Sequence, residues 1–309
     1  MTMSADGVDR RPGTDARTST GTSTDTIGHT IEHHATIDST NERARALARS
    51  GAPHGLAIVA DTQTAGRGQH GRAWHSPPGS GLYVSFLVRP NIAPRDAPVL
   101  PLLTGVAVRE ALATRTATAL GLKWPNDILV AAPPHRGRKL AGILVEASAT
   151  EARMDYAILG IGINVKAAGR APALETYAIA LDELDRAAGA PTPTPTTKAK
   201  SETETETETE AARASVNEIF RAVAEALDRW LARASVDGMA PVLAAWTHHA
   251  LGRSERVFIV DGNETHAGTL LGPGSDGALR LQVSSDPDDV RVFYRGALTI
   301  PGFPKPPDR

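Results

Sequence analysis

Short apolar runs separated by polar turns fill the middle of the chain. Each run has the length and apolar content of a buried strand. The predicted strands are Leu56–Ala60, Leu82–Val88, Leu122–Lys123 with Ile128–Val130 after a turn, Lys139–Glu146 and Tyr156–Val165. Because hairpins connect most of these strands, we expect an α+β fold, with a mixed or antiparallel sheet and helices on one side.

Helical spacing of apolar residues predicts four helices. They cover Ser39 to about Ser50, about Ala97 to Leu120, Ser215 through Leu231, and about Pro241 to His249. Ser39 and Glu42 have the spacing of a capping box, so Ser39 is expected to cap the first helix. Ser39, Thr40 and Asn41 also place hydroxyl and amide groups together, which leaves open a second interpretation as a polar ligand site.

The C-terminal part and two further segments have patterns of their own. From Arg256 onward, short strands between glycine turns predict a small β-barrel of about 50 residues. Residues 1–28 and Pro191–Glu210 lack an apolar face and are predicted to be disordered. The alternation of Thr and Glu in the second segment has the period of a strand, but its lack of apolar residues argues against one.

Composition narrows the classes of function. A net charge of −2 gives no reason to expect a nucleic acid or an anionic membrane as partner. The chain has no cysteine, which excludes disulfides, thiolate metal sites and cysteine nucleophiles. No apolar run approaches the roughly 18 residues of a membrane span, and the N-terminus lacks a signal-peptide core. We therefore expect a cytoplasmic protein.

The stretch Thr62–Trp74 is the strongest candidate for chemistry. It follows a predicted strand and reads TQTAGRGQHGRAW, with three glycines among arginines, a glutamine and a histidine. Glycine permits backbone conformations in which N–H groups turn inward, and arginine adds permanent charge and forked donors. A loop of this composition favours an anion, most simply a phosphate.

Three further polar groups lie at strand ends. Lys123, Asn126 and Asp127 stand at the Pro-Asn-Asp turn between two strands, a position that is either structural or chemical. Lys139 opens a strand in which Gly142 permits close backbone approach. Gly160-x-Gly162, ending at Asn164, lies within a strand and lacks the third glycine and the helix of a dinucleotide-binding fingerprint.

These motifs together resemble the biotin protein ligases (biotin–[acetyl-CoA-carboxylase] ligases). The resemblance runs in order through Asp38–Asn41, Gln63, GRGQHGRAW, KWPND at Lys123–Asp127, KLAGIL at Lys139–Leu144 and GIGIN at Gly160–Asn164. It implies the biotin/lipoate ligase catalytic fold in residues 29–252, with the disordered insertion at about 190–211. An SH3-like domain would follow at 253–309. With no room for a DNA-binding domain before residue 29, the chain resembles the short class.

The resemblance also implies an activity and roles for individual residues. Biotin and ATP, with Mg²⁺, would give biotinyl-5′-AMP, and a lysine of a biotin carboxyl carrier protein would then accept the biotin. Lys139, Arg67 and Lys123 would be catalytic. Biotin and its adenylate would contact Ser39, Thr40, Asn41, Gln63, Arg67, Gly68, Gln69, Arg72, Trp74, Lys139 and Gly142. The ATP and magnesium region would contain Lys123, Asn126, Asp127 as a possible metal ligand, Asn164 and Tyr177.

Two alternative functions remain open, and the sequence differs from the family pattern at one position of the loop. A lipoate or octanoate ligase would use the same fold and chemistry, and a non-catalytic biotin-binding regulator would keep only the binding residues. Gln69 stands where many members of the family have a basic residue, which puts the retention of the intermediate in question. His248 and His249 are adjacent on a helix and are expected to be solvated rather than to bind metal. The sequence leaves a homodimer open and predicts no DNA or membrane partner.

Overall fold

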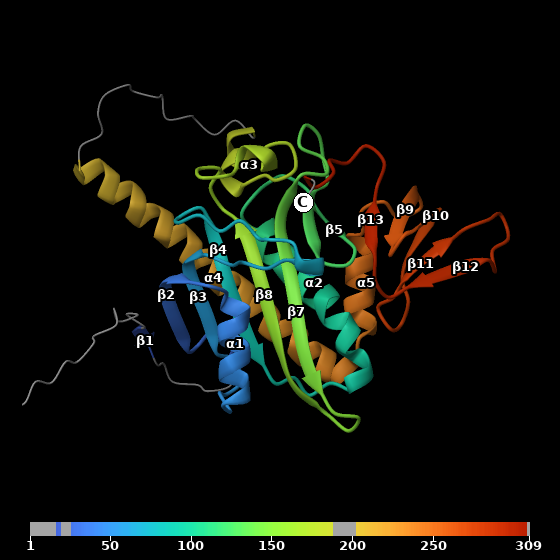
Figure 1. Cartoon of the computed structure of the whole chain (residues 1–309), viewed down its shortest axis with the longest axis horizontal. Coiled ribbons are helices and arrows are strands. Elements are labelled where there is room, and N and C mark those ends of the chain that lie inside the picture. Colours follow the sequence, from blue (N-terminus) through green and yellow to red (C-terminus); the bar gives the residue numbers. More distant parts are fainter. Residues whose placement is uncertain (1–16, 20–25, 188–201, 308–309) are drawn as a thin grey trace, which may run out of the picture.

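The computed structural model describes residues 17–19, 26–187 and 202–307. A mixed sheet of eight strands forms its centre, in the order β1-β2-β3-β4-β8-β7-β6-β5 (Figure 1). Its strands are β1 Arg17–Ser19, β2 Ile31–Ile37, β3 Ala57–Gln63, β4 Gly81–Val88, β5 Leu120–Lys123, β6 Asp127–Val130, β7 Lys139–Ala149 and β8 Met154–Asn164. Within these strands β2 and β3 pair in parallel and the other neighbours are antiparallel.

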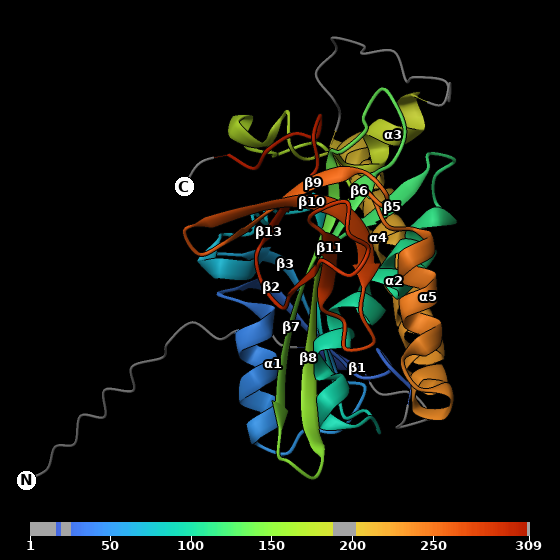
Figure 2. The ribbon, with the colours of Figure 1, turned by 90° about the vertical axis from the view of Figure 1, so that its right-hand side faces the viewer.

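Helices cover both faces of this sheet, and the expectation of helices on one side is wrong. The α-helices are α1 Thr40–Arg49, α2 Leu100–Ala113, α3 Leu181–Ala187, α4 Glu202–Asp237 and α5 Ala240–His248, and 3₁₀ turns occur at η1 Gln69–Gly71, η2 Pro94–Val99 and η3 Pro172–Leu174. Figures 1 and 2 show α1 on one side of the sheet and α2, α4 and α5 on the other. The alternation of side chains explains this, because Leu87 and Ile158 pack under α1 while their neighbours Phe86 and Leu159 belong to the larger core.

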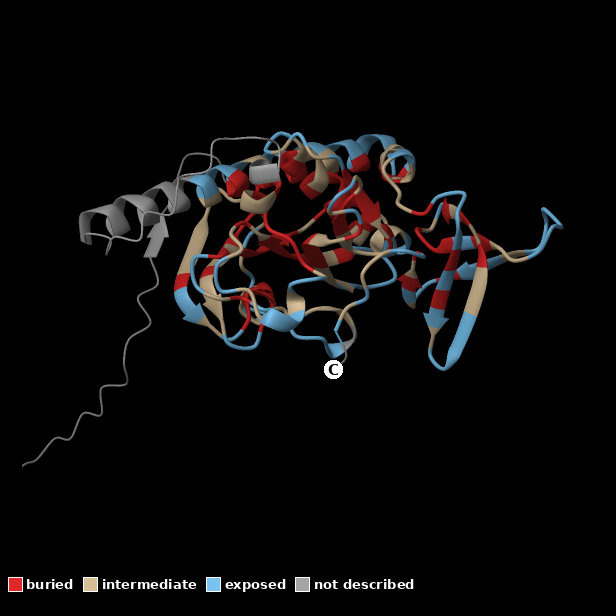
Figure 3. Cartoon of the chain, turned by 90° about the horizontal axis from the view of Figure 1, so that it is seen from above, coloured by how far each residue is buried: buried red, intermediate tan, exposed pale blue. Residues whose placement is uncertain are grey.

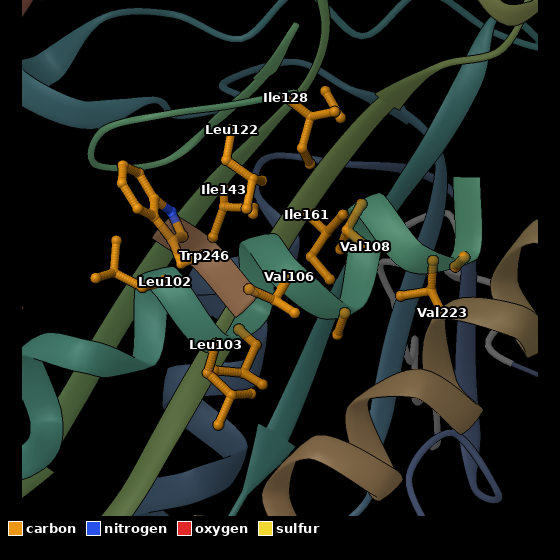
Figure 4. Close-up of a cluster of buried hydrophobic side chains, with 14 of the residues drawn as sticks. Leu102, Leu103, Val106, Val108, Leu122, Ile128, Ile143, Ile161, Val223 and Trp246 are labelled. Carbon is orange, nitrogen blue, oxygen red and sulfur yellow. The ribbon is translucent and has the colours of Figure 1, made fainter. Parts of the chain in front are cut away.

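The larger core lies between the sheet and α2, α4 and α5. Figure 4 shows Leu103, Val106 and Val108 of α2 near Ile143 and Ile161 of the sheet. Full burial of such a side chain contributes about 1.5–3 kcal/mol. Viewed from above, the buried residues form a band through the middle of the molecule (Figure 3). This core holds β7 and β8 rigidly, so their opposite face can carry a site.

A second, five-stranded antiparallel sheet follows α5 and lies beside the first (Figure 1). Its order is β12-β11-β10-β9-β13, from β9 Arg256–Asp261, β10 Glu264–Pro273, β11 Leu279–Gln282, β12 Val290–Phe293 and β13 Ala297–Thr299. Four of these strands match the sequence prediction, whereas the three-residue β13 is too short for a recognisable pattern. The sheet is consistent with the predicted small barrel-like fold.

The ends of several elements differ from the sequence prediction. Helix α2 stops at Ala113 and not near Leu120, which instead begins β5. The three threonines that follow Ala113 explain the early end, since β-branched residues are weak helix formers. In the part of the chain that the structure describes, no helix combines the length and apolarity needed to cross a membrane.

Two segments predicted to be disordered contain regular structure. Arg17–Ser19 pair with Ile31–His33 as the edge strand β1, and Ile27 is buried in the core. Residues 202–210 of the predicted insertion form the first turns of α4. A helix extends at low cost once its packed part has formed, and glutamates suit its N-terminal end. Residues 1–16, 20–25 and 188–201, which also belong to these predicted segments, lie outside the described residues.

Candidate active site

Three glycines of β7 and β8 lack side chains on one face of the sheet, and side chains from other segments occupy the space over them. Gly142 pairs with Gly162, and Gly160 lies two residues before Gly162. We call Gly142, Gly160 and Gly162 the glycine trough. The Trp74 indole lies on it, and a Cβ at Gly142 would stand 2.7 Å from that ring, while a Cβ at Gly162 would overlap it. The glycines are therefore needed for an aromatic ring to approach the sheet.

Residues 64–76 form the covering loop, which carries Trp74 across the trough. It closes on itself where the Gly68 N–H donates to the Arg72 carbonyl (2.7 Å) and the Trp74 N–H donates to the Gly66 carbonyl (2.8 Å). Of its three glycines, Gly71 has a positive φ of 72°. The expectation of inward-turned N–H groups is thus wrong at Gly68, whose N–H serves the loop's own hairpin.

One end of the trough is lined by a buried hydrogen-bond network. The Thr40 N–H donates to Gln63 Oε1 (2.9 Å), and Gln63 Nε2 donates to Ser76 Oγ (3.1 Å). Ser85 Oγ lies 2.7 Å from Thr40 Oγ1 and 2.6 Å from Asn41 Oδ1. The structure thus brings Thr40, Asn41 and Gln63 together, as the sequence predicted.

Ser39 is buried beside this network, but the predicted capping box does not form. Its backbone carbonyl accepts the first helical hydrogen bond, from the Arg43 N–H (3.1 Å), but its side chain makes no capping hydrogen bond. Glu42 turns away from the cap and pairs with Arg45 and Arg67. Ser39 is therefore the N-cap residue of α1, as expected, but the predicted box between its hydroxyl and Glu42 is wrong.

Charged side chains gather at the other end of the trough. Lys139 Nζ lies 2.6 Å from Asp127 Oδ1 and 5.2 Å from the centre of the Trp74 ring. Lys123 and Arg72 are close enough to act electrostatically on this pair. Three cations thus surround one carboxylate, an arrangement that favours a polyanionic ligand.

The two lysines differ in how firmly they hold their protons. Burial lowers the pKa of Lys123 below its ordinary value, and the neighbouring cations Lys139 and Arg72 lower it further. Burial also works against the charge of Lys139, but the Asp127 carboxylate and Tyr177 together outweigh it, so the pKa of Lys139 is raised. Lys139 is therefore the more firmly charged of the two.

Three residues that were predicted to lie near the nucleotide contact other groups of the protein instead. Asn126 Nδ2 donates to the Ile143 carbonyl (2.7 Å), and Asn164 Nδ2 donates to the carbonyls of Lys139 and Ile179 (both 3.2 Å). These amides hold the backbone around Lys139. The Tyr177 carbonyl accepts the Lys139 N–H (2.7 Å), and burial raises the pKa of the Tyr177 hydroxyl near the charged group.

Arg67 and Gln69 do not join the charged group. Arg67 forms an ion pair with Glu42, and half of its side chain is exposed (51%). Gln69 lies in the 3₁₀ turn η1, where its carbonyl accepts the Arg72 N–H. Arg72 alone of the two loop arginines approaches the lysines.

Two polar residues near the trough had not been singled out as site residues. Ser85 is fully buried in β4, and its place within the apolar run Leu82–Val88 was a usable signal. Glu146 accepts the Asn41 amide (2.9 Å) from the far end of β7. Its role depends on a contact between distant segments and has no local signal in the sequence.

Two other predictions concern the surroundings of the trough. Trp124 of KWPND is buried and donates its indole N–H to the Gly277 carbonyl (3.3 Å), which links the two sheets. His248 is exposed, but His249 is half-buried, so the expectation of a solvated pair is wrong for His249; the two rings pack edge to face at 4.6 Å. Within the residues that the structure describes, no group of three potential metal ligands occurs among His, Cys, Asp and Glu.

Comparison with known proteins gives the same picture over most of the chain. Residues 34–164 match the sequence model of the Biotin/lipoate A/B protein ligase family. The Biotin--[acetyl-CoA-carboxylase] ligase of Paracoccus denitrificans is 31% identical over 250 residues, which are 80% of this chain and 92% of that protein. The Bifunctional ligase/repressor BirA of Bacillus subtilis is 41% identical over 145 residues, but these are 47% of this chain and 43% of that protein.

Solved structures agree with the sequence matches. The biotin protein ligase from Aquifex aeolicus in complex with biotin and ATP superposes with a TM-score of 0.64 and 26% identity. That alignment covers 87% of this chain and 97% of the other. The Paracoccus ligase and the Aquifex structure are both covered over more than nine-tenths of their length. The chain is therefore a member of the biotin protein ligases within the Biotin/lipoate A/B protein ligase family.

Proposed function

We propose that this protein is an ATP-dependent biotin protein ligase. The biotin carboxylate attacks the α-phosphate of ATP, which releases pyrophosphate and leaves biotinyl-5′-AMP. A lysine amine of a carboxyl carrier protein then attacks the activated carbonyl carbon and releases AMP. The observation that carries this proposal is the glycine trough, with amide and hydroxyl groups at one end and three cations at the other.

The network around Asn41 suits the ureido head of biotin. Thr40 is hydrogen-bonded to Gln63 and is linked to Asn41 through Ser85, and each of the three side chains offers both donors and acceptors. A ureido group also carries N–H donors and a carbonyl acceptor. When biotin binds, its ureido group takes the place of some hydrogen bonds within the network, so that every buried polar group keeps a partner. Ser39, buried beside them, completes this wall.

The charged group suits the phosphate end. Lys139 stabilises the charge that develops on the α-phosphate, and Lys123 and Arg72 add positive potential around it. One such donor in a dry site contributes about 3 kcal/mol to the transition state. Neither step needs a covalent enzyme nucleophile, which agrees with the absence of cysteine. Asn126 and Asn164 act by holding the backbone near Lys139, and Tyr177 closes this end.

The covering loop shelters the mixed anhydride from water. Trp74 lies on the trough. Arg67, which precedes Gly68 and Gln69 in the loop, pairs through its backbone with Ala73, the residue before Trp74. A reactive acyl phosphate survives only where water is excluded. The amide of Gln69 keeps hydrogen-bonding capacity at this point but adds no charge.

Magnesium enters this account as part of the MgATP substrate. Asp127 is the one carboxylate of the charged group, and its Oδ1 already faces Lys139. Mg²⁺ in nucleotide sites is held by one or two carboxylates together with the phosphates and water. The site fits a metal that arrives with ATP and has Asp127 nearby.

The proposal also covers the protein partner, the cellular location and the boundary between the two domains. The partner is a biotin carboxyl carrier domain of a carboxylase, reached in the cytoplasm. Residues 29–252 form the catalytic domain and 253–309 the SH3-like domain. The similarity to the Paracoccus ligase along nearly all of its length supports this assignment.

Transfer of label to a carrier domain tests the activity. The protein is incubated with MgATP, a purified carrier domain and either labelled biotin or labelled lipoate. We expect label on the carrier lysine from biotin. Label from lipoate alone would assign the chain to the lipoate ligases, and biotin binding without transfer would make it a regulator.

A further inference from the structure

Arg67 of the covering loop is tied to the first turn of α1 by an ion pair with Glu42. The same carboxylate accepts Arg45 Nη1 on its other oxygen (2.6 Å). Glu42 is 28% exposed and Arg67 51% exposed, so the pair bridges the edge of the site. It is the contact through which a charged side chain of the loop is fixed to the helix that presents Asn41.

The ion pair continues into the polar end of the trough. Arg45 also pairs with Glu146 through its second terminal nitrogen. Glu146 in turn accepts the Asn41 amide (2.9 Å), and Asn41 lies directly over Gly160. The signs of charge alternate along Arg67, Glu42, Arg45 and Glu146. A network of this kind is stronger than an isolated surface pair.

The Glu42 pair holds the start of the loop's hairpin, whereas Trp74, His75 and Ser76 hold its C-terminal part against other segments. The base of the loop is fixed by hydrogen bonds from the Thr64 and Ala65 N–H groups to the carbonyls of Ile37 and Asp38 (both 2.9 Å). Its hairpin is closed mainly by bonds within the loop itself. The Arg67 side chain joins that hairpin to a rigid helix.

We propose that Glu42 is a positioning residue that anchors the covering loop over the trough through Arg67. It touches neither the trough glycines nor the lysines, so it acts through another side chain. Arg45 and Glu146 set the direction of the Glu42 carboxylate and connect the same anchor to Asn41. Loss of the anchor frees the loop without removing a group that contacts substrate.

Limited proteolysis of the ligand-free protein tests the anchor without any assumption about activity. Arg72 is exposed in the covering loop, so trypsin cleavage after Arg72 reports how often the loop leaves the sheet. We expect Glu42→Gln to raise this rate about two- to fivefold, from the strength of such pairs. Glu110→Gln is the matched control, since Glu110 bridges Arg229 and Trp230 on the far face.

A second variant protects the test against a folding defect in α1. Arg67→Met removes the same pair from the loop side and should give a similar increase. The double variant should then be cleaved no faster than either single one. An unchanged rate after Arg72 in both single variants, or two effects that simply add, would overturn the proposal.

A second experiment measures enzyme kinetics. It rests on the proposed function, and its result is interpreted separately from that of the proteolysis. In the biotinylation assay, Glu42→Gln should raise the KM for biotin severalfold and leave kcat nearly unchanged. A loss confined to kcat would overturn the positioning role. If the wild-type protein fails to use biotin, the proteolysis result still decides whether Glu42 anchors the loop.

Discussion

The ammonium of Lys139 lies 2.6 Å from the carboxylate of Asp127, at the cationic end of the glycine trough. This pair favours the charged form of Lys139, whereas burial works against it, and the pKa of Lys139 is raised above its ordinary value. Lys123 closes the same hairpin opposite Asp127 but is held less firmly in its charged form. We therefore propose that Lys139 has the main electrostatic role in the activation step.

Removal of this ammonium should abolish most of the activation step. Lys139→Ala is expected to lower the rate of biotinyl-adenylate formation by at least about two orders of magnitude, because a preorganised charge is lost from the transition state. Single-turnover formation of the adenylate measures this directly. Lys305→Ala removes an exposed lysine near the C-terminus and should leave the rate unchanged. Near-normal adenylation by Lys139→Ala would remove it from its role.

A side chain in the glycine trough should displace Trp74. In Gly162→Ala the new methyl group overlaps the indole, so the ring must move or the strand must shift. We expect a loss of about 1–3 kcal/mol in the free energy of unfolding and weaker binding of biotin. Chemical denaturation and isothermal titration measure the two effects. Trp74→Leu added to Gly162→Ala should recover part of the stability, and strictly additive effects would refute the contact.

The buried hydroxyl of Ser85 should support both stability and substrate binding. Ser85→Ala leaves Thr40 and Asn41 each short of a partner, which should cost about 1–2 kcal/mol. The KM for biotin should rise while the KM for ATP stays nearly constant. Thr104→Ala removes a buried hydroxyl from α2, where it bonds to the Leu100 carbonyl, and should change stability alone. Equal effects on both substrates would argue against a specific link between Ser85 and the biotin end.

A pH dependence follows from His249 at the end of α5. Burial, with Arg109 and His248 nearby, lowers the pKa of His249 to about 4. The unfolded chain takes up this proton near pH 6.5 and the folded chain does so near pH 4. The free energy of unfolding should therefore fall as the pH drops between these values. His249→Asn should flatten that decline in denaturation curves, whereas an unchanged pH profile would contradict the burial of His249.

Much of the fold is visible in the sequence because its causes are local. The apolar runs at Leu82–Val88 and Tyr156–Val165 predict β4 and β8 within one residue or two. The side of the sheet that each helix covers was missed. Which face a helix takes depends on the alternation of side chains in several strands together, as the opposite directions of Phe86 and Leu87 illustrate.

In the candidate site too, residues in local motifs could be predicted from the sequence, whereas their contacts with distant segments could not. The structure places Thr40, Asn41 and Gln63 in one network and Lys123, Asp127 and Lys139 in a second group, so residues from separate motifs do come together. The residues that hydrogen-bond to these side chains come from distant segments, and a local sequence pattern does not reveal such long-range contacts. Glu42 thus looked like half of a capping box, although its carboxylate pairs with Arg67 of the loop. The amides of Asn126 and Asn164 likewise turn to backbone carbonyls.

Exchange of labelled pyrophosphate into ATP tests the central claim most directly, because it reports the first step without a carrier protein. The account predicts exchange that requires biotin and Mg²⁺ and is lost in Lys139→Ala. Exchange that is supported by lipoate and not by biotin would contradict it. So would a folded wild-type protein that binds biotin and MgATP and shows no exchange.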